Sequence, residues 1–398
     1  MEKRNRHIAL LMTAAALLLC SCSHDDATVE QSVPEPVEQG TPIAFATQQQ
    51  EEQTVTRAVG LETKTTFFKV YGFKNMDCDD NGTTNDPTDD SYSTNQNVFP
   101  GYVVKWVANT AGTSTTNTND WEYVNQQPLG QDEQTIKYWD WSAKAYRFFG
   151  VAGADGTNEV TAALKTINKG EANEYEVYEL TYDADAEKEA TDPTAVPYYS
   201  HLWFSNGTPG QPQFGKPVVL EFIKPLSKVR FKFIFEDPAQ AKDTELTEKR
   251  FHPTNNNTIK MSGKVTITYP LTGTGVKESF HATAEAGGIS AFTQDYYATV
   301  EKTNGTVTSP YFNADENATG IVYTVLPAIG QGTYILSLYV GGDPKSTIVP
   351  AEFMDWLPGY SYTYIFKVHV DKSVAIDDVQ SAFTEWENHY ADHTVYNW

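Results

Sequence analysis

The sequence predicts an all-β protein built from two tandem antiparallel β-sandwich domains, with one short helix. Several stretches alternate strictly between apolar and polar side chains, as half-buried antiparallel strands do. Clusters of Gly, Pro, Asn and Asp separate these stretches at short intervals. Aromatic residues make up 13% of the chain, including 23 Tyr, and suit packing between sheets. Short strands with few helices favour packed sandwiches over parallel α/β units.

The first residues are expected to be a targeting segment rather than part of the fold. A basic start is followed by an apolar run over residues 8–19, which is too short to span a bilayer as a stable helix. A lipoprotein peptidase needs a small residue before the cysteine that becomes acylated. Ser21 meets this need for Cys22, whereas Leu19 before Cys20 does not. We predict a lipoprotein signal peptide over 1–21 and a lipid on Cys22, with ordinary secretory cleavage as the alternative.

Charge and cysteine content restrict the partners and the source of stability. The chain carries 29 basic and 52 acidic residues, a formal net charge of −23. Such a charge disfavours nucleic acid and anionic membrane surfaces as partners. After processing, Cys78 is the single remaining thiol, so no intramolecular disulfide is expected. The mature chain must then obtain its stability from core burial.

The segment after the signal peptide combines a tether with a first strand. Residues 23–40 are polar and contain two prolines, as a tether would. Residues 41–47 place Ile43 and Phe45 on one face, which predicts a short strand. A run rich in Gln, Glu and Thr follows and contains Arg57 and Ala58.

The remaining strands are predicted from period-2 patterns. The clearest covers 228–236, with Val229, Phe231, Phe233 and Phe235 on one face and charged residues on the other. Two further regular strands are expected at 264–269 and 360–370. Less regular candidates lie near 66–73, 102–107, 145–151, 174–181, 218–223, 321–326 and 333–340.

Two features interrupt this series of strands. Val160, Ala163, Leu164 and Ile167 have helical spacing, which predicts a short helix over 160–167. The Pro- and Gly-rich segment 206–217 is the best candidate for a domain boundary. It divides the chain into an N-terminal sandwich over 58–215, after the tether and first strand at 22–57, and a C-terminal sandwich over 216–398.

Three segments together resemble the fimbrillin family, the polymerising pilus subunits of Bacteroidota. YWDW at 138–141, followed by YRFF at 146–149, is similar to the core of that family's N-terminal domain. PLSKVRF at 225–231 resembles the strand that opens its C-terminal domain. LPGYSYTY at 357–364 is the most specific match. Lys224 and Pro225 stand where the family usually has a histidine, a departure that we expect to be structural. The resemblance implies transthyretin-like, Greek-key sandwiches.

The resemblance also implies a function. Members of this family are exported as lipoproteins and cut after an arginine by a trypsin-like protease. Loss of the first strand opens a groove, which a strand from the next subunit fills. Carried over to this chain, the cut falls between Arg57 and Ala58 and removes the strand Pro42–Thr47. The expected protein is a structural fimbrial subunit at the cell surface, anchored by lipid to the outer membrane. Its partners would be other pilin subunits, and it would support adhesion.

The residues fit this mechanism on physical grounds. An arginine in a polar run is an accessible site for proteolysis, and the alternative is that Arg57 is one more solvated charge. A sandwich that loses a strand exposes unpaired backbone groups that accept a complementary strand. Thr394, Tyr396 and Trp398 share one parity and make the C-terminal tail a candidate donor strand. The alternative, that the tail completes its own sheet, is left open.

An acidic segment matches the first half of a calcium-binding loop. Asp77, Asp79 and Asn81, with Gly82 at the turn, offer oxygen ligands in the order that such loops use. The twelfth position is Thr88 rather than a bidentate Glu. An acidic, solvated hairpin loop is therefore the favoured interpretation, and calcium is the alternative.

No motif indicates catalysis. The chain lacks a GxSxG nucleophile elbow and a glycine-rich phosphate loop, so we expect it not to be an enzyme. The alternative function is a surface lipoprotein that binds glycans. Trp139, Trp141 and Trp203 are candidates for a sugar-stacking platform, but their apolar neighbours favour core packing for all three.

Overall fold

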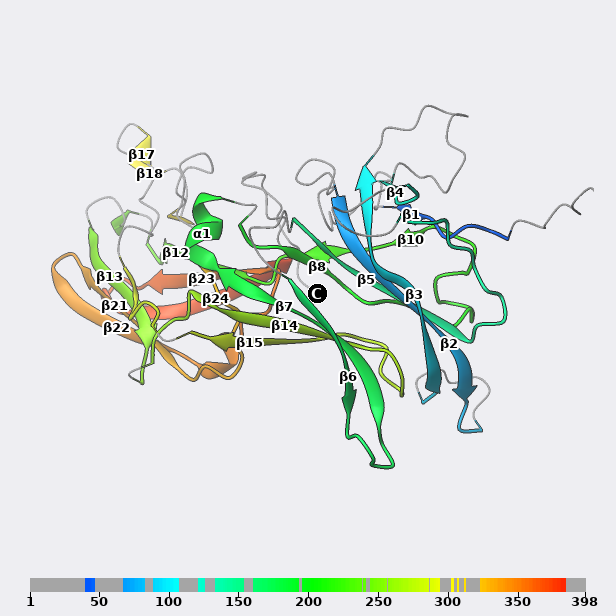
Figure 1. Ribbon diagram of the computed structural model, residues 1–398. Coiled ribbons are helices and arrows are strands. Elements are labelled where there is room, and N and C mark those ends of the chain that lie inside the picture. The colour runs from blue at the N-terminus through cyan, green and yellow to red at the C-terminus, as the bar shows by residue number, and fades with distance from the viewer. Residues whose placement is uncertain are drawn as a thin grey trace, which may run out of the picture. The chain divides into compact units, whose positions relative to one another are not determined.

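The computed structural model consists almost entirely of strands and contains a single short α-helix among the residues that it describes (Figure 1). These are residues 40–46, 67–82, 89–106, 121–125, 133–153, 160–192, 195–237, 239–240, 244–255, 257–285, 287–293, 302–303, 306–307, 311–312 and 323–383. The predicted all-β class is confirmed. All of the described residues fall within one compact unit, which begins at Gly40.

The largest sheet has nine strands and is covered on both faces. Its order is β10 (Val218–Val219), β1 (Phe45–Ala46), β4 (Trp121–Glu122), β3 (Ser91–Trp106), β2 (Phe67–Asp79), β5 (Ala145–Ala152), β8 (Tyr198–Ser200) and β11 (Phe222–Ile223), and β9 (Trp203–Ser205) also pairs with β5. Every residue of β5 is buried. Tyr146 and Phe148 belong to the core on one face, and Phe149 and Val151 to the core on the other.

A four-stranded sheet packs against the second of these cores. It contains β15 (Ser279–Ala284), β14 (Ser262–Pro270), β7 (Tyr175–Asp185) and β6 (Thr161–Ile167), in that order. Tyr269 on β14 stacks on Phe149 of β5, with ring centroids 3.9 Å apart. Val265, Ile267 and Tyr269 are fully buried, which confirms the predicted strand at 264–269.

The predicted helix over 160–167 is wrong. This segment is strand β6, which pairs antiparallel with β7 from Thr161 to Ile167. The helical spacing was misleading because the apolar residues of β6 do not form a buried stripe, and Leu164 is 53% exposed. The one described α-helix, α1 (Ala186–Thr191), begins instead after β7, where the Asp185 carboxylate accepts the backbone N–H groups of Glu187 and Lys188.

Strands from both sides of segment 206–217 share sheets. β1 pairs with β10, β8 with β11, and β7 with β14. The segment itself is a series of turns, in which Gly207, Gly210 and Gly215 adopt positive φ. The division into two domains at 215/216 stays a prediction, and hydrogen-bonded strands cross it.

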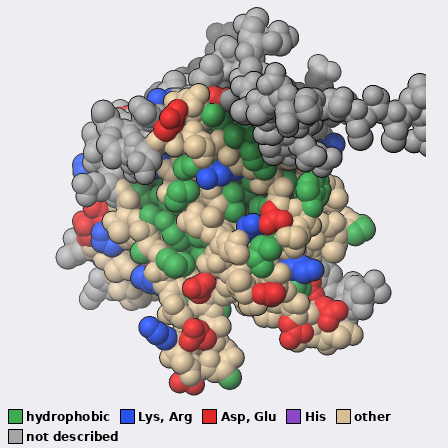
Figure 2. Space-filling model, turned by 45° about the vertical axis from the view of Figure 1, so that its right-hand side comes forward, with side chains coloured by type: hydrophobic (Ala, Val, Ile, Leu, Met, Phe, Trp, Pro, Cys, Tyr) green, Lys and Arg blue, Asp and Glu red, His purple; other side chains and the backbone are tan. Residues whose placement is uncertain are grey.

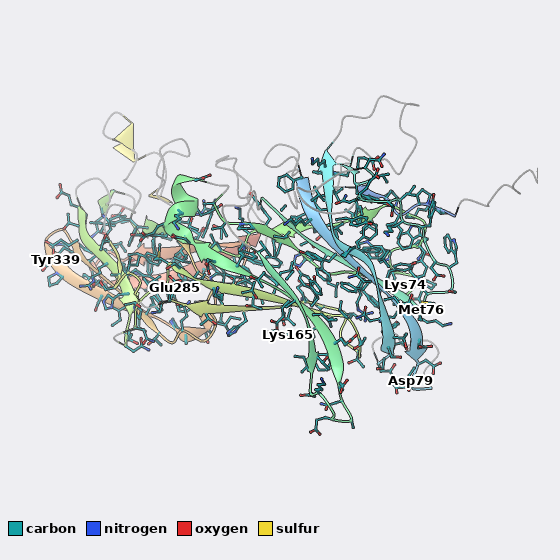
Figure 3. The ribbon with its side chains drawn as sticks, viewed as in Figure 1. Lys74, Met76, Asp79, Lys165, Glu285 and Tyr339 are labelled. Carbon is teal, nitrogen blue, oxygen red and sulfur yellow. The ribbon has the colours of Figure 1, made fainter. Side chains whose placement is uncertain are left out.

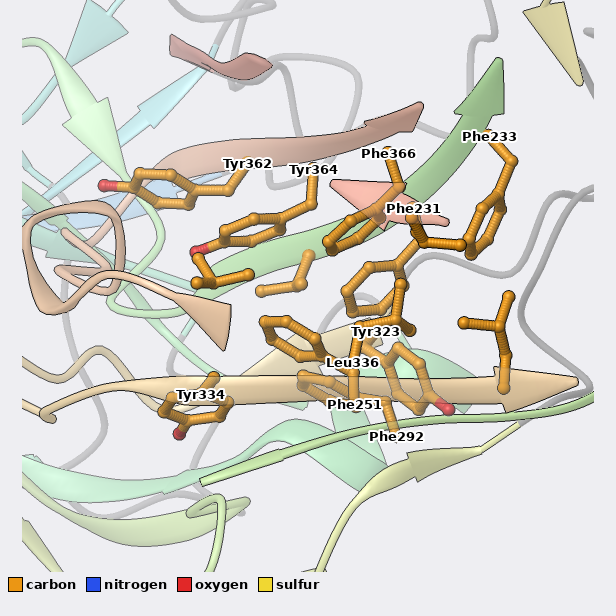
Figure 4. Packing of buried hydrophobic residues seen from close by; sticks show 14 of the residues in the cluster. Phe231, Phe233, Phe251, Phe292, Tyr323, Tyr334, Leu336, Tyr362, Tyr364 and Phe366 are labelled. Carbon is orange, nitrogen blue, oxygen red and sulfur yellow. The ribbon is translucent and has the colours of Figure 1, made fainter. Parts of the chain in front are cut away.

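Two further sheets enclose a third core near the C-terminus (Figure 4). One contains β19 (Tyr311–Phe312), β12 (Ser227–Phe235), β23 (Tyr360–Val368) and β24 (Val374–Phe383), and β20 (Tyr323–Val325) also pairs with β12. The other contains β16 (Phe292–Thr293), β13 (Leu246–Pro253), β21 (Tyr334–Val340) and β22 (Asp343–Val349). A 3₁₀ turn covers Ala351–Phe353, and β17 (Lys302–Thr303) pairs with β18 (Thr306–Val307).

The strongest strand prediction is confirmed in this third core. Val229, Phe231, Phe233 and Phe235 of β12 are all buried. Strand β23 differs from its predicted alternation, because its polar residues Ser361 and Thr363 are buried as well. It lies in the interior of its sheet, paired parallel with β12 on one edge and antiparallel with β24 on the other, and side chains on both of its faces are buried.

A buried ion pair joins α1 to the segment that precedes β12. Lys224 is fully buried, and its Nζ lies 2.9 Å from Oε1 of Glu189 and 4.1 Å from the centre of the Tyr198 ring. Glu189 also accepts the backbone N–H of Val196. Burial raises the pKa of the Glu189 carboxyl to about 7, although Lys224 opposes this shift. Lys224, at which the sequence departs from the fimbrillin pattern that it resembles, thus has a structural contact.

Replacing Lys224 with Met should lower the free energy of unfolding by about 3–5 kcal/mol at pH 7.5, because it leaves a buried carboxylate without its partner. Urea denaturation measures this loss. The pKa of Glu189 is raised in the folded protein, so folding takes up a proton and stability falls as pH rises from about 4.5 to 7. The loss should accordingly be smaller at pH 5. The double variant Lys224→Met/Glu189→Gln should recover most of it, and no recovery would refute the pairing.

Candidate functional site

The segment 41–46 lies in the nine-stranded sheet with bonded neighbours on both of its edges. On one edge, the Ile43 N–H donates to the Lys137 carbonyl at 2.8 Å and the Trp139 N–H donates to the Thr41 carbonyl at 2.9 Å. On the other, the Val218 N–H donates to the Ala44 carbonyl at 2.8 Å. β1 then runs parallel to β10 and antiparallel to β4. The predicted strand is therefore present and is inserted between two others.

The side chains of this segment complete an aromatic core. Ile43 and Phe45 both have no exposed surface, as their shared parity predicted. Four rings surround that of Phe45 in edge-on contacts, with centroids 5.3 to 6.0 Å away: Phe99, Tyr123, Phe68 and Phe148. Burying two such side chains contributes about 3–6 kcal/mol. If the segment left, it would open this core to solvent.

Buried polar side chains bond to the backbone of segment 41–46 and of the chain segments beside it. The Tyr123 hydroxyl donates to the Ile43 carbonyl at 2.9 Å and accepts the Lys137 N–H at 3.0 Å. Burial raises the pKa of this hydroxyl well above its ordinary value. The Gln134 side chain exchanges two hydrogen bonds with the Val103 backbone and donates a third to the Tyr123 carbonyl. Neither Tyr123 nor Gln134 was predicted. No sequence pattern marks a tyrosine or glutamine whose side chain bonds to the backbone of another strand.

An aromatic rim lies beside the start of the segment. Tyr138 is 37% exposed and packs on Gly40, whereas Trp141 is 62% exposed and lies over Gly215. The Asp140 carboxylate binds Lys74 and Ser142, and the Lys74 ammonium above all holds its pKa at about 2. On the face that Figure 2 shows, acidic and basic side chains are interspersed with apolar ones.

The three predicted core tryptophans have different environments. Trp139 is buried and stacks on Phe214, which confirms core packing for it. Trp203 is half-buried against the same core. Core packing is wrong for Trp141, because it falls in the turn before β5 and its indole lies on the surface.

The other residues of the predicted mechanism lie outside the described part of the chain. They are the lipidation site Cys22, the cleavage site Arg57–Ala58 and the donor residues Thr394, Tyr396 and Trp398. Their roles stay predictions. Within the described residues, no helix is long and apolar enough to cross a membrane.

The residues of the predicted calcium loop lie at the end of the β2–β3 hairpin. Asp77 is still in β2, opposite Ser93, and Asp79 ends the strand (Figure 3). The Asp79 carboxylate accepts the N–H of Asn81, as in a solvated turn. Among the described residues no group of three His, Cys, Asp or Glu side chains is arranged to hold a metal ion. Residues 83–88 of the loop are not described, so calcium stays a prediction.

Comparisons with known proteins give similarity only at the level of structure. No family model and no curated protein matches the chain. A proposed cell adhesion protein from Bacteroides uniformis aligns with 81% of this chain and 92% of its own, at 13% identity and a TM-score of 0.32. The fimbrial anchor protein Mfa2 from Porphyromonas gingivalis aligns with 87% of this chain and 97% of its own, at 12% identity and a TM-score of 0.28.

A fimbrial assembly protein from Parabacteroides distasonis aligns with 79% of this chain and 91% of its own, at 13% identity and a TM-score of 0.27. The chain is thus similar to adhesion and fimbrial proteins, the kind of protein that its sequence resembles.

Replacing Phe45 with Ala should lower the free energy of unfolding by about 3–5 kcal/mol, because it leaves a cavity among four aromatic rings. Phe353→Ala is a matched control, since the side chain of Phe353 is 36% exposed and its loss should cost less than about 1 kcal/mol. Urea denaturation of both variants tests this expectation. Equal losses would show that segment 41–46 is not part of the core in solution.

Proposed function

We propose that this chain is a structural fimbrial subunit that polymerises by strand exchange after proteolysis removes its first strand. One observation carries the proposal: segment 41–46 completes the core of the nine-stranded sheet, yet it precedes the polar run that contains Arg57. A cut after Arg57 would leave this segment attached by noncovalent contacts alone. The groove that it fills would then be available to another strand.

The energetics of the segment suit an exchange. While the segment is covalently linked to β2, its buried side chains and backbone hydrogen bonds keep it in place without any cost of association. Cleavage turns this intramolecular contact into an association between two molecules, which must also overcome the lost translational freedom. An emptied groove would expose the edges of β4 and β10 together with an apolar core. Both features favour a replacement strand from a neighbouring subunit.

The C-terminal tail is the proposed replacement strand. β24 ends at Phe383, and residues 384–398 follow it. Extended, they span about 50 Å, which is long enough to reach a second molecule. Tyr396 and Trp398 have the same two-residue spacing as Ile43 and Phe45, whose side chains fill the groove. Main-chain bonds would supply affinity, and these aromatic side chains would set the register.

The proposal includes the location and partners of the protein. A lipid on Cys22 would anchor the precursor to the outer membrane, and a trypsin-like protease would release the mature subunit at the cell surface. Other pilin subunits are the expected partners, and no catalytic role is proposed.

Limited trypsin digestion of the chain from Ser23 onward tests this function. We expect one early cut that yields Ala58 as the new N-terminus, identified by intact mass and N-terminal sequencing. The cut protein should then form oligomers that resist SDS, whereas Arg57→Gln should remain uncut and monomeric. A variant that lacks residues 384–398 should be cut but should not polymerise, because it lacks the donor.

Each outcome has a distinct meaning. A cut product that stays monomeric at all concentrations would contradict polymerisation by strand exchange. Polymers formed without residues 384–398 would still support the groove as the acceptor site, but they would exclude the tail as the donor strand.

The exposed rim favours a second candidate function, the binding of neutral glycans. Trp141 and Tyr138 present aromatic surface beside side chains that form hydrogen bonds. The uncut protein would then be retained on a polysaccharide affinity gel, and Trp141→Ala would lose this retention while Phe353→Ala would keep it. Equal elution of all three proteins would exclude this function for the rim.

A further inference from the structure

Strand β6 has an open edge with few of the features that usually block pairing. The order of its sheet is β15, β14, β7, β6, and no described strand pairs with the outer edge of β6. Its seven residues, TAALKTI, include no Pro or Gly and one charge, Lys165 (Figure 3). Lys165 already forms an ion pair with Glu179 on β7. All seven residues are exposed or half-buried.

Three other edge strands of the described sheets carry features that discourage pairing. β22 begins with Asp343, Pro344 and Lys345, and a proline or a charge discourages edge pairing. β24 carries adjacent Asp377 and Asp378 and an irregularity in its register with β23. β15 is uncharged, but Glu278 directly precedes it and Glu285 directly follows it, so an acidic residue stands at each end of this edge. β6 has neither a proline nor a register irregularity, and its one charge, Lys165, is already paired with Glu179.

An apolar row leads from the core to this edge. Tyr178 on β7 pairs with Tyr269 on one side and with Leu164 of β6 on the other. The Tyr178 ring packs 5.0 Å from that of Tyr71, inside the core. Leu164 is the last member of the row and is 53% exposed. A further strand with an apolar residue opposite Leu164 would continue the core outward.

We propose that β6 pairs antiparallel with β6 of a second copy of this chain, about a two-fold axis at Leu164. The pair would join two four-stranded sheets into one. A two-fold axis perpendicular to the sheet keeps each face on its own side, so residues of the same parity must be opposite each other. One residue of β6 must therefore be directly opposite its own copy, and the axis lies midway between these two copies of the same residue.

Length and charge select Leu164 among the residues at the centre of β6. An axis at Leu164 pairs all seven residues, whereas an axis at Ala163 or Lys165 pairs only part of the strand. An axis at Lys165 would also place two lysines in direct opposition, which is unfavourable. With the axis at Leu164, Lys165 is opposite Ala163 of the other copy, and each Leu164 covers the other. This self-complementarity identifies a second copy as the occupant.

The association should be weak and should strengthen with salt. One strand pair buries less than the roughly 1,000 Å² that stable interfaces need. Each copy carries a net charge of −23, so two copies repel each other at a distance. Added salt screens this repulsion but leaves the uncharged edge contact intact. The pairing does not use segment 41–46, so it is independent of the proposed strand exchange and is testable on the uncut chain.

Cysteine pairing across the two-fold axis tests the proposal. The background is Cys78→Ser, because Cys78 is an exposed free thiol. Leu164→Cys should form a disulfide-linked dimer on mild oxidation, since opposed Cβ atoms lie about 4.5–5.5 Å apart. Ala163→Cys and Lys165→Cys should each form little dimer alone, but their mixture should form the mixed dimer readily. Non-reducing gels and mass spectrometry identify the products.

A charge-exchange experiment gives an independent measure. Leu164→Lys and Leu164→Glu should each weaken self-association about tenfold in sedimentation velocity, and an equimolar mixture should recover it. The proposal would be overturned by Ala163→Cys cross-linking as fast as Leu164→Cys, by a mixture of the charged variants that associates no better than either alone, or by association that weakens with salt.

Discussion

The burial of aromatic side chains on both faces of one sheet is the constraint on which the described structure depends. β5 contributes Tyr146 and Phe148 to one core and Phe149 and Val151 to the other. The one described cysteine, Cys78, is a free thiol, so this packing is not reinforced there by a disulfide. The sheet therefore needs a complete cover on each face. Segment 41–46 contributes Ile43 and Phe45 to one of the two cores, and the sheet of β6, β7, β14 and β15 covers the other.

This constraint explains why so short a segment matters to the stability of the sheet. A strand at the margin of a sheet can leave without opening a core, but β1 lies between β10 and β4 with Phe45 at the centre of four rings. Its contacts are numerous, and its connection to the rest of the fold runs through one polar stretch of chain. Under the proposed strand exchange, a subunit built in this way would be stable while it is intact and would accept another strand once that connection is cut.

Sequence patterns predicted the strands whose environment differs between their two faces. β12 and β14 were predicted well, because each has one apolar face and one polar face. β23 was predicted as a strand, but the burial of Ser361 and Thr363 on its polar face is not shown by any local pattern. The segment 160–167 was assigned to a helix because four apolar residues happened to have helical spacing. At the candidate site, the shared parity of Ile43 and Phe45 predicted that both are buried. The roles of Tyr123 and Gln134 could not be predicted, because their side chains bond to backbone groups of other segments.

The parallel pairing of β12 with β23 affects how the chain reaches its folded state. Arg230 Nε donates to the hydroxyl of Thr363, and these two residues are 133 positions apart. Contacts of such long range form late, because a long loop must close before any energy is gained. The third core therefore cannot assemble until residues near 360–368 are available to cover β12. A chain that emerges from an export channel with its N-terminus first would keep this region unfolded until its last part has crossed.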